Sequence, residues 1–313
     1  MKNNFTKYYS IAPMMGKTDS YFCYLMSFIN KDIRIYTEMM HTEAIIRTNI
    51  LENYKILKDL SNITVQIAGN QPNSMAKAAK KIAEYGFSEI NINCGCPSKN
   101  VIAGEFGLSL LQTPKIVKKC VEAIRNETSI SISVKTRIGI GHIENVELLD
   151  NFVNEVNSSG VNKYVIHARN GILGNYSTKN NLSIPPLKYK RVFELKKKFF
   201  DNKIIINGGF LNTLDFSKYK NKVDGIMIGR EAYKNPWIFV EKNISYKQKI
   251  NVILRYLYDL KIFFKNAYFN KNSIMHIQKL FNNINGAKEW RKNVNYTLHN
   301  NDLQHLLNYI ESK

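Results

Sequence analysis

The chain has 313 residues and is strongly basic, with 45 lysine and arginine residues against 25 aspartate and glutamate residues and a net charge of +20. Its hydrophobic content of 44% is enough for a large core, and no apolar run is long enough to cross a bilayer, so we expect a cytoplasmic protein with no membrane contact. The charge indicates a polyanionic partner such as a nucleic acid, although a general bias toward lysine and asparagine would raise it as well.

Eight short apolar segments are predicted to be β-strands, and most are separated by segments with the helical spacing of apolar residues. Strands that alternate with helices favour a (β/α)8 TIM barrel. A doubly wound open sheet is the alternative, but Gly139-Ile140-Gly141 lacks the third glycine of the dinucleotide-binding fingerprint. The predicted strands are Tyr9–Ala12, Ile33–Thr37, Ile63–Ile67, Glu89–Asn93, Ser131–Lys135, Lys163–His167, Lys203–Asn207 and Asp224–Ile228. The predicted helices between them are Asn73–Tyr85, Thr113–Arg125, Asn145–Ser158 and Tyr189–Phe199.

Beyond about Val240 the pattern changes to amphipathic helices only, predicted at Lys247–Lys265, Ile274–Asn283 and Leu303–Ile310. We therefore divide the chain into a barrel domain, residues 1–242, and a small all-helical domain, residues 243–313. The helical domain holds a basic cluster beside an aromatic residue, a composition typical of a surface that binds RNA phosphates, although any one helix could have a basic face that is merely solvated. The cluster includes Lys279, Lys288, Arg291 and Lys292 beside Trp290.

Polar residues follow the end of almost every predicted strand. In a TIM barrel the carboxyl ends of the strands meet on one face, where active sites lie, so we expect a single cavity lined by hydrogen-bonding groups. The turns after the last two strands contain glycines, and barrels commonly bind a phosphate there through backbone amides, which predicts a phosphorylated cofactor. The strand-end residues are Pro13, Met14, Glu38, Gln66, Asn93, Cys96, Lys135, Arg137, His167, Arg169, Asn207, Gly208, Gly209, Gly229 and Arg230.

The segment Asn91-Ile92-Asn93-Cys94-Gly95-Cys96-Pro97-Ser98 alternates like a strand and then turns. Gly95 allows a sharp turn and Pro97 ends the strand, so Cys96 is held at a strand end, where catalytic residues are often found. The four cysteines of the chain are too few for a disulfide framework and are expected to be reduced thiols. A metal site at Cys94 and Cys96 is the alternative, but the second pair of ligands is missing, so we expect no metal.

These motifs, in this order and spacing, closely resemble those of the tRNA-dihydrouridine synthases over nearly the whole chain. Two segments, Ile184–Leu187 and Gly286–Arg291, are most similar to the A branch of the bacterial enzymes. The other motifs are Ala12-Pro13-Met14, Tyr36-Thr37-Glu38-Met39, Asn91–Ser98, Val134–Gly139, His167-Ala168-Arg169, Ile206–Gly209 and Val223–Arg230.

The resemblance implies an enzyme that binds FMN and uses NADPH to reduce the C5=C6 bond of uridines in the D-loop of tRNA, at position twenty or its neighbour. It implies that Cys96 is the catalytic acid, which donates a proton to C5 while hydride reaches C6. It also assigns the other strand-end residues. The residues implied to bind the flavin are Pro13, Met14, Gln66, Lys135 and His167 at the ring, with Asn207, Gly208, Gly209, Gly229 and Arg230 at the phosphate. Those implied to contact the substrate are Asn93, Arg137 and Arg169.

Two other functions fit part of the sequence. An FMN barrel of the dihydroorotate dehydrogenase type would act on a free pyrimidine, but the net charge and the basic helical segment argue against it. A tRNA-binding protein without catalysis would act as an RNA-folding aid, but the presence of Cys96, Lys135 and His167 argues against that. We expect a monomer. The sequence departs from the family pattern at Gly16-Lys17, Asn170 and Leu182, in loops expected to face RNA, which bears on substrate range rather than on chemistry.

Overall fold

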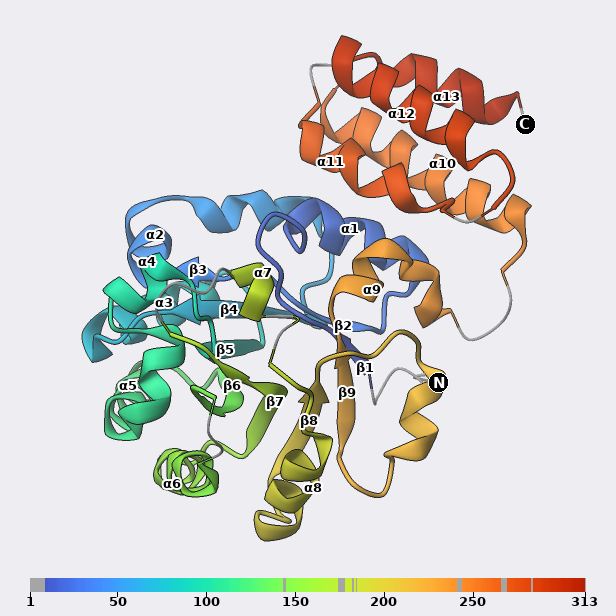
Figure 1. The fold of residues 1–313 in the computed structure, drawn as a ribbon. Helices are drawn as coiled ribbons and strands as arrows, with labels where there is room; N and C mark the ends of the chain where they lie inside the picture. The colour runs from blue at the N-terminus through green and yellow to red at the C-terminus, as the bar shows by residue number, and fades with distance from the viewer. Residues whose placement is uncertain are drawn as a thin grey trace.

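The computed structural model describes residues 9–142, 145–173, 178–181, 183, 185–240, 244–265, 269–282 and 284–312. Figure 1 shows a barrel of strands with helices around it, and a group of helices from the C-terminal part of the chain that sits above α1. None of the described helices is both long and apolar enough to cross a lipid bilayer.

Eight parallel strands of the described chain close into a barrel, which confirms the predicted fold and excludes the open sheet. Strand β1 (Tyr9–Ile11) pairs with β2 (Arg34–Tyr36) on one side and β9 (Gly225–Ile228) on the other, and β2 pairs with β4 (Ile63–Ala68). Between β4 and β9 the remaining strands of the barrel pair in chain order, each with the next. These strands are β5 (Glu89–Cys94), β6 (Ser131–Ile140), β7 (Lys163–Gly171) and β8 (Lys203–Asn207). A ninth strand, β3 (Met40–His41), pairs with the end of β4.

The polar face of the strands lies inside the barrel. Alternation in β5 is typical of a half-buried strand, yet all six of its residues are buried. Ile90 and Ile92 pack in the cluster shared with the helices, whereas Glu89 and Asn91 bond to side chains of neighbouring strands. Ser133 Oγ on β6 links them, since it accepts from Asn91 Nδ2 at 2.9 Å and donates to Glu89 Oε1 at 2.8 Å. These polar side chains of β5 therefore find hydrogen-bond partners inside the barrel.

Strands β6 and β7 are longer than the sequence predicts. They were expected to end at Lys135 and His167, but their pairing continues to Ile140 and Gly171, with a shift of register between Arg137 and Gly139. The extended pair therefore projects beyond the other strand ends and forms part of the wall around that end of the barrel. Sequence alternation could not show this, because polar residues continue through the strand ends without a turn signal.

The helices that cover the barrel include the four that the sequence predicts. Helices α3 (Pro72–Glu84) and α5 (Pro114–Glu127) each begin with proline, which suits the first helical turn. Asn145 caps α6 (Val146–Asn157) by accepting a hydrogen bond from the backbone of Leu148. The other helices of the barrel are α2 (Thr42–Arg47), α4 (Lys99–Ala103), α7 (Thr178–Asn181), α8 (Tyr189–Lys198) and α9 (Arg230–Lys234). Short 3-10 helices are η2 (Ile50–Ile56), η3 (Gly107–Gln112), η4 (Leu214–Lys218) and η5 (Pro236–Phe239).

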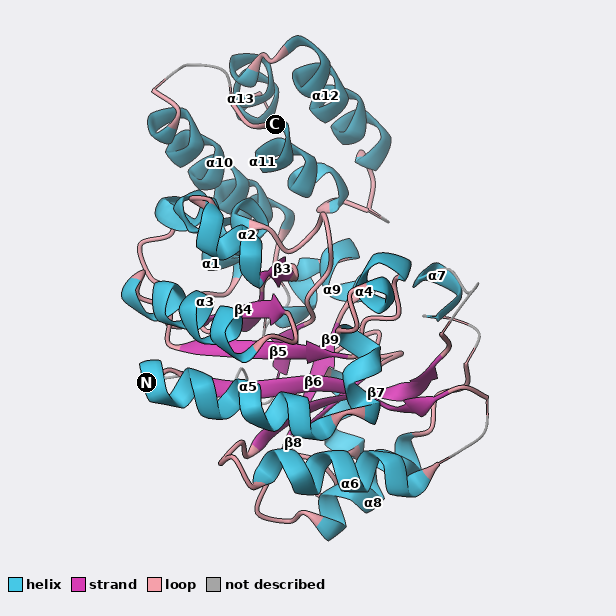
Figure 2. Cartoon of the chain, turned by 90° about the vertical axis from the view of Figure 1, so that its left-hand side faces the viewer, coloured by secondary structure: helices cyan, strands magenta, loops and turns pink. Residues whose placement is uncertain are grey.

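Helix α1 (Ser20–Ile29) was not predicted, because it is apolar on nearly all sides and lacks an amphipathic pattern. The structure gives the reason. Cys23 and Met26 belong to the main core, while Tyr24 packs on Tyr256 and donates a hydrogen bond to Asp259 Oδ2 at 2.7 Å, both in α10. Figures 1 and 2 show α1 between the barrel and the C-terminal helices.

The C-terminal helices form the all-helical part of the fold that the sequence predicts. They are α10 (Tyr246–Phe263), α11 (Lys271–Met275), η6 (His276–Lys279), α12 (Ala287–Asn300) and α13 (Leu303–Glu311). Helix α12 was not predicted, since its asparagines are weak helix formers, although Trp290, Val294 and Thr297 are buried at helical spacing. The segment predicted at Ile274–Asn283 covers the last two residues of α11 and all of η6. Asn283 lies outside the described residues, as does the proposed boundary at 242 and 243.

Candidate active site

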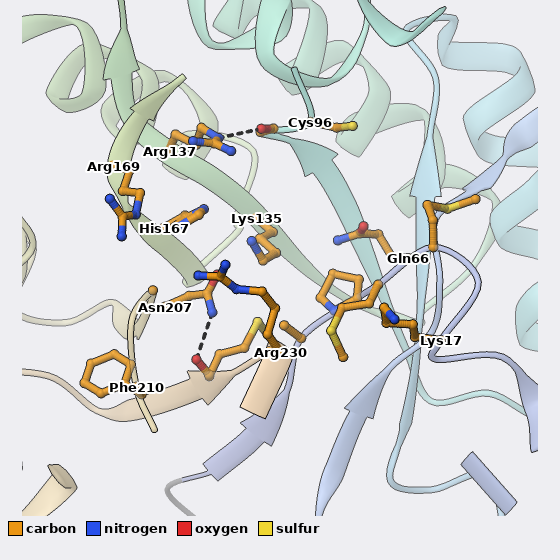
Figure 3. A pocket seen from close by; sticks show the side chains of 18 of the residues that line it. Lys17, Gln66, Cys96, Lys135, Arg137, His167, Arg169, Asn207, Phe210 and Arg230 are labelled. Carbon is orange, nitrogen blue, oxygen red and sulfur yellow. Dashed lines mark hydrogen bonds between the residues drawn. The ribbon is translucent and has the colours of Figure 1, made fainter. Parts of the chain in front are cut away.

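A cavity of about 610 Å³ opens at the carboxyl ends of the barrel strands. Figure 3 shows side chains from many different strand ends pointing into it. Every barrel residue to which the sequence assigned a catalytic, cofactor-binding or substrate-binding role lines this one cavity. These residues are Pro13, Met14, Gln66, Asn93, Cys96, Lys135, Arg137, His167, Arg169, Asn207, Gly208, Gly209, Gly229 and Arg230.

Strand register explains why they meet. Asn93 on β5 is the register partner of Lys135 on β6, and Arg137 is the partner of His167 on β7, which in turn is paired with Asn207 on β8. Side chains alternate between the two faces of a strand, so residues at these positions all face the barrel interior. Four consecutive strands therefore present polar groups at neighbouring levels of the same cavity.

The backbone around Cys96 is held in a defined turn. Asn93 Oδ1 accepts hydrogen bonds from the backbone nitrogens of Gly95 at 3.1 Å and Cys96 at 2.9 Å. The backbone of Leu108 donates to the carbonyl oxygen of Cys96 at 3.0 Å. These bonds use no atom of the Cys96 side chain. Cys96 is partly exposed and lines the cavity, and its thiol donates a hydrogen bond to Ser98 Oγ at 3.5 Å.

Cys94, two residues earlier, has the opposite environment. Its side chain is fully buried in the main core, and burial raises the pKa of its thiol well above the usual range. It does not line the cavity. The side chains of Cys94 and Cys96 therefore do not share one site, and Cys94 is a packing residue of the core.

Gln66 is fixed by a chain of amide groups across β4 and β5. Its Nε2 donates to Asn91 Oδ1 at 2.7 Å, and its Oε1 accepts from Asn93 Nδ2 at 2.8 Å. Both ends of the amide are thereby oriented. Asn93 consequently has a structural task in addition to its place at the cavity, because it orients Gln66 and holds the turn before Cys96.

His167 is buried and Lys135 is half-buried, and both lie beside other cations. Burial, followed by repulsion from Arg137, lowers the pKa of Lys135 to about 7. Burial, followed by repulsion from Arg137 and Lys135, holds the pKa of His167 well below its usual range, so its ring is neutral at neutral pH. Among the described residues, no carboxylate is paired with Lys135. A site of this kind favours an anion, since a negative charge would relieve the repulsion.

Two of the arginines that line the cavity, Arg137 and Arg169, differ in how many of their N–H donors are bonded within the protein. Arg137 is only 3% exposed and donates from Nε to the Gly95 carbonyl at 3.0 Å and from Nη1 to the carbonyls of Asn170 at 2.9 Å and Asn181 at 3.0 Å. It therefore ties together the ends of β5 and β7 and helix α7. Arg169 donates from Nη1 to carbonyls of the 183–185 segment, while its buried Nε has no partner among the described residues.

The turn after β8 packs tightly against His167, Leu187 and Tyr189. Gly208 has φ +119° and Gly209 has φ +78°. An added Cβ on Gly208 would lie 2.8 Å from the His167 ring, and one on Gly209 would lie 2.5 Å from Leu187. Only glycine fits these positions. Arg230, at the start of α9, is exposed at the rim of the same part of the cavity.

Several cavity residues were not assigned a role from the sequence. Apolar ones give no chemical signal, although Phe210 and Leu211 directly follow the glycine turn and could have been found by extending the strand-end rule. The apolar residues missed are Met15, Met39, Phe210, Leu211 and Met227, and the charged residues missed are Lys17, Glu231 and Lys234.

The predicted RNA-contacting residues of the helical part lie outside the cavity. Lys288 and Arg291 are exposed on α12, where Arg291 Nη1 donates to Asn282 Oδ1 at 3.3 Å. Lys279, in η6, instead lies close to the barrel, with its amine 5.5 Å from the centre of the Tyr233 ring in α9.

The overall architecture is similar to that of solved barrel proteins. Morphinone reductase matches with a TM-score of 0.52 at 10% identity, over 74% of this chain and 84% of that chain. An old yellow enzyme homologue from Zymomonas mobilis matches with a TM-score of 0.52 at 11% identity, over 74% of this chain and 86% of that chain. At such low identity the likeness concerns the fold alone.

Sequence comparisons give the family. A tRNA-dihydrouridine(20/20a) synthase of Synechocystis is 34% identical over 90% of this chain and 87% of its own length. Its counterparts in Shewanella oneidensis (33% identity, 95% of this chain, 91% of theirs) and Escherichia coli K12 (34%, 97% and 92%) are similarly related. The sequence profile of the dihydrouridine synthases matches residues 10–312, and this chain therefore belongs to the dihydrouridine synthase family.

Proposed function

We propose that this protein reduces uridine to 5,6-dihydrouridine in the D-loop of tRNA, at positions 20 and 20a, the positions printed in the names of its relatives. The observation on which the proposal rests is the single cavity in which the thiol of Cys96 is presented together with half-buried Lys135 and neutral His167.

The residues present fit FMN as the cofactor. Gly208 and Gly209 line the cavity with backbone alone, and Arg230, which lines the same cavity, can pair with a phosphate. Lys135 can offset negative charge on the reduced ring, and Gln66 offers an oriented amide to a polar ring edge. Pro13, Met14, Asn207 and Gly229 complete this part of the wall. When bound, FMN supplies hydride for C6 of uracil, and NADPH is the proposed electron donor.

Cys96 is the proposed general acid. Reduction of the C5=C6 bond requires a proton at C5 as well as a hydride at C6, and the Cys96 thiol is the proton donor that the turn presents to the cavity. Such a step contributes a rate factor on the order of 10²–10⁴. Arg169 is better placed than Arg137 to contact the nucleotide. Its hydrogen bonds to backbone carbonyls of the described residues all come from Nη1, whereas Arg137 bonds to three carbonyls through Nε and Nη1.

We further propose that residues 1–242 perform the chemistry and residues 243–313 contribute tRNA affinity. The charge of +20 supports a polyanionic substrate, and Lys279, Lys288 and Arg291 are the proposed phosphate contacts of the helical part.

The test is a conversion assay. Purified protein is incubated with FMN, NADPH and an unmodified tRNA transcript, and the product is digested and analysed by mass spectrometry. We expect uridines at positions 20 and 20a to gain the mass of two hydrogen atoms. Reduction of free uridine or uracil at a comparable rate, with no reaction on tRNA, would contradict the proposal.

A further inference from the structure

Two lysines from different parts of the fold meet at one aromatic ring beside the cavity. The amine of Lys17, in the loop between β1 and α1, lies 4.3 Å from the centre of the Tyr233 ring, and the amine of Lys279, in η6, lies 5.5 Å from the same centre. The two amines are therefore no more than about 10 Å apart, since both distances are measured to one point. Lys17 also lines the cavity.

The Tyr233 ring is held by a chain of hydrogen bonds across the junction between the barrel and the helical part. Tyr233 Oη lies 3.1 Å from His276 Nδ1, and His276 Nε2 lies 2.8 Å from Asp19 Oδ1. A carboxylate only accepts, so the imidazole donates from Nε2 to Asp19. Asp19 also accepts from the backbone of Phe22 at 2.9 Å and so caps α1. Asp19 lies two residues after Lys17, and His276 three residues before Lys279, so this chain also fixes the separation of the lysines.

The two lysines make no direct ion pair with any described residue at this point. Among the described residues neither Lys17 nor Lys279 is paired with a carboxylate. Both side chains are partly buried, and burial together with repulsion from Lys279 lowers the pKa of Lys17. Figure 3 shows Lys17 across the cavity from Arg169, with Arg230 between them, so cations lie on several sides of the opening.

We propose that Lys17 and Lys279 form a clamp for one backbone phosphate of the RNA substrate, held by the two amines beside Tyr233 where the barrel meets the helical part. The inference rests on the proposed function, because it takes the polyanion to be tRNA. A phosphate between the amines relieves their repulsion and needs no base-specific contact, so the clamp sets the position of the strand relative to the cavity rather than reading its sequence. The phosphates of NADPH share the same chemistry, and the experiment separates the two sources.

The experiment measures tRNA affinity of the FMN-loaded full chain by filter binding at several salt concentrations. Lys17→Gln and Lys279→Gln should each weaken binding about threefold to tenfold near physiological salt and make the salt dependence shallower. Because both amines hold one phosphate, the double variant should lose less affinity than the product of the single losses. Lys279→Arg should restore most of the affinity. The matched control is Lys203→Gln, an exposed lysine at the start of β8, at the opposite end of the barrel.

The following results would each contradict one part of the inference or of the proposed function. Losses in the double variant equal to the product of the single losses would show two independent contacts and overturn the shared clamp. A rise in the KM for NADPH larger than the loss of tRNA affinity would assign the lysines to the dinucleotide. Affinities equal to wild type in both single variants would overturn the clamp alone, whereas a wild-type protein that neither binds nor modifies tRNA would refute the proposed function beneath it.

Discussion

A single methyl group added at Gly208 should weaken both the folded state and FMN binding. In Gly208→Ala the new Cβ would lie 2.8 Å from His167 Cδ2 and 2.9 Å from Leu187 Cδ2, distances that force these neighbours to move. The backbone adds a second cost, because φ is +119°. Strain of this kind costs about 1–2 kcal/mol and overpacking about 1–3 kcal/mol, so we expect the free energy of unfolding to fall by about 2–5 kcal/mol.

The matched control is Gly286→Ala. Gly286 has φ +84° and no atom within 4 Å of an added Cβ, so it isolates the backbone strain. Its loss should be about 1–2 kcal/mol, with no effect on flavin affinity. Unfolding would be followed by circular dichroism in urea, and FMN binding by quenching of flavin fluorescence. Because the displaced His167 ring lines the cavity, we expect Gly208→Ala to bind FMN at least about tenfold more weakly. The reasoning is wrong if Gly208→Ala binds FMN like wild type and loses no more stability than the control.

Three further predictions concern single side chains. Cys96→Ala should leave the reduction of bound flavin by NADPH nearly intact but slow dihydrouridine formation by a factor on the order of 10². Cys94→Ala should slow it far less. Equal effects of the two substitutions in single-turnover assays would show that Cys96 is not the acid. Arg230→Ala should weaken FMN retention in equilibrium dialysis while changing the spectrum of bound flavin little, and a large spectral shift with unchanged affinity would place it at the ring instead. Lys135→Met should raise the free energy of unfolding of the cofactor-free protein at pH 6, because the desolvated amine of Lys135 is charged there. This gain should shrink by about 1.4 kcal/mol per pH unit from pH about 7 toward the usual lysine pKa. A gain that does not change with pH in urea titrations would contradict the assigned burial cost.

The sequence was sufficient to predict the barrel fold and the polar residues that line its cavity, for one physical reason. Strand ends in a closed parallel barrel converge, so the polar residues after Ile92, Val134 and Ile166 had to meet whatever the loops did. Register then follows from period-two alternation, which places Lys135 and His167 on the inner face.

What the sequence could not show depends on contacts between distant segments. Arg137 looks like a substrate contact from its position alone, and only the structure reveals that it bonds to carbonyls of Gly95, Asn170 and Asn181. Lys17 and Lys279 are separated by most of the chain, and no local pattern indicates that they share one ring. Periodicity also fails for α1, because a helix buried on two sides has no polar face to detect.

The position of α1 has a consequence for how this protein unfolds. Its aromatic side chains Tyr21, Tyr24 and Phe28 pack on Phe264 and Tyr256 of the helical part, while Cys23 and Met26 pack in the barrel core. Neither lobe can lose its partner without exposing one side of this helix to water. We therefore expect the two lobes to melt as a single cooperative unit, with one calorimetric transition whose van't Hoff and calorimetric enthalpies agree.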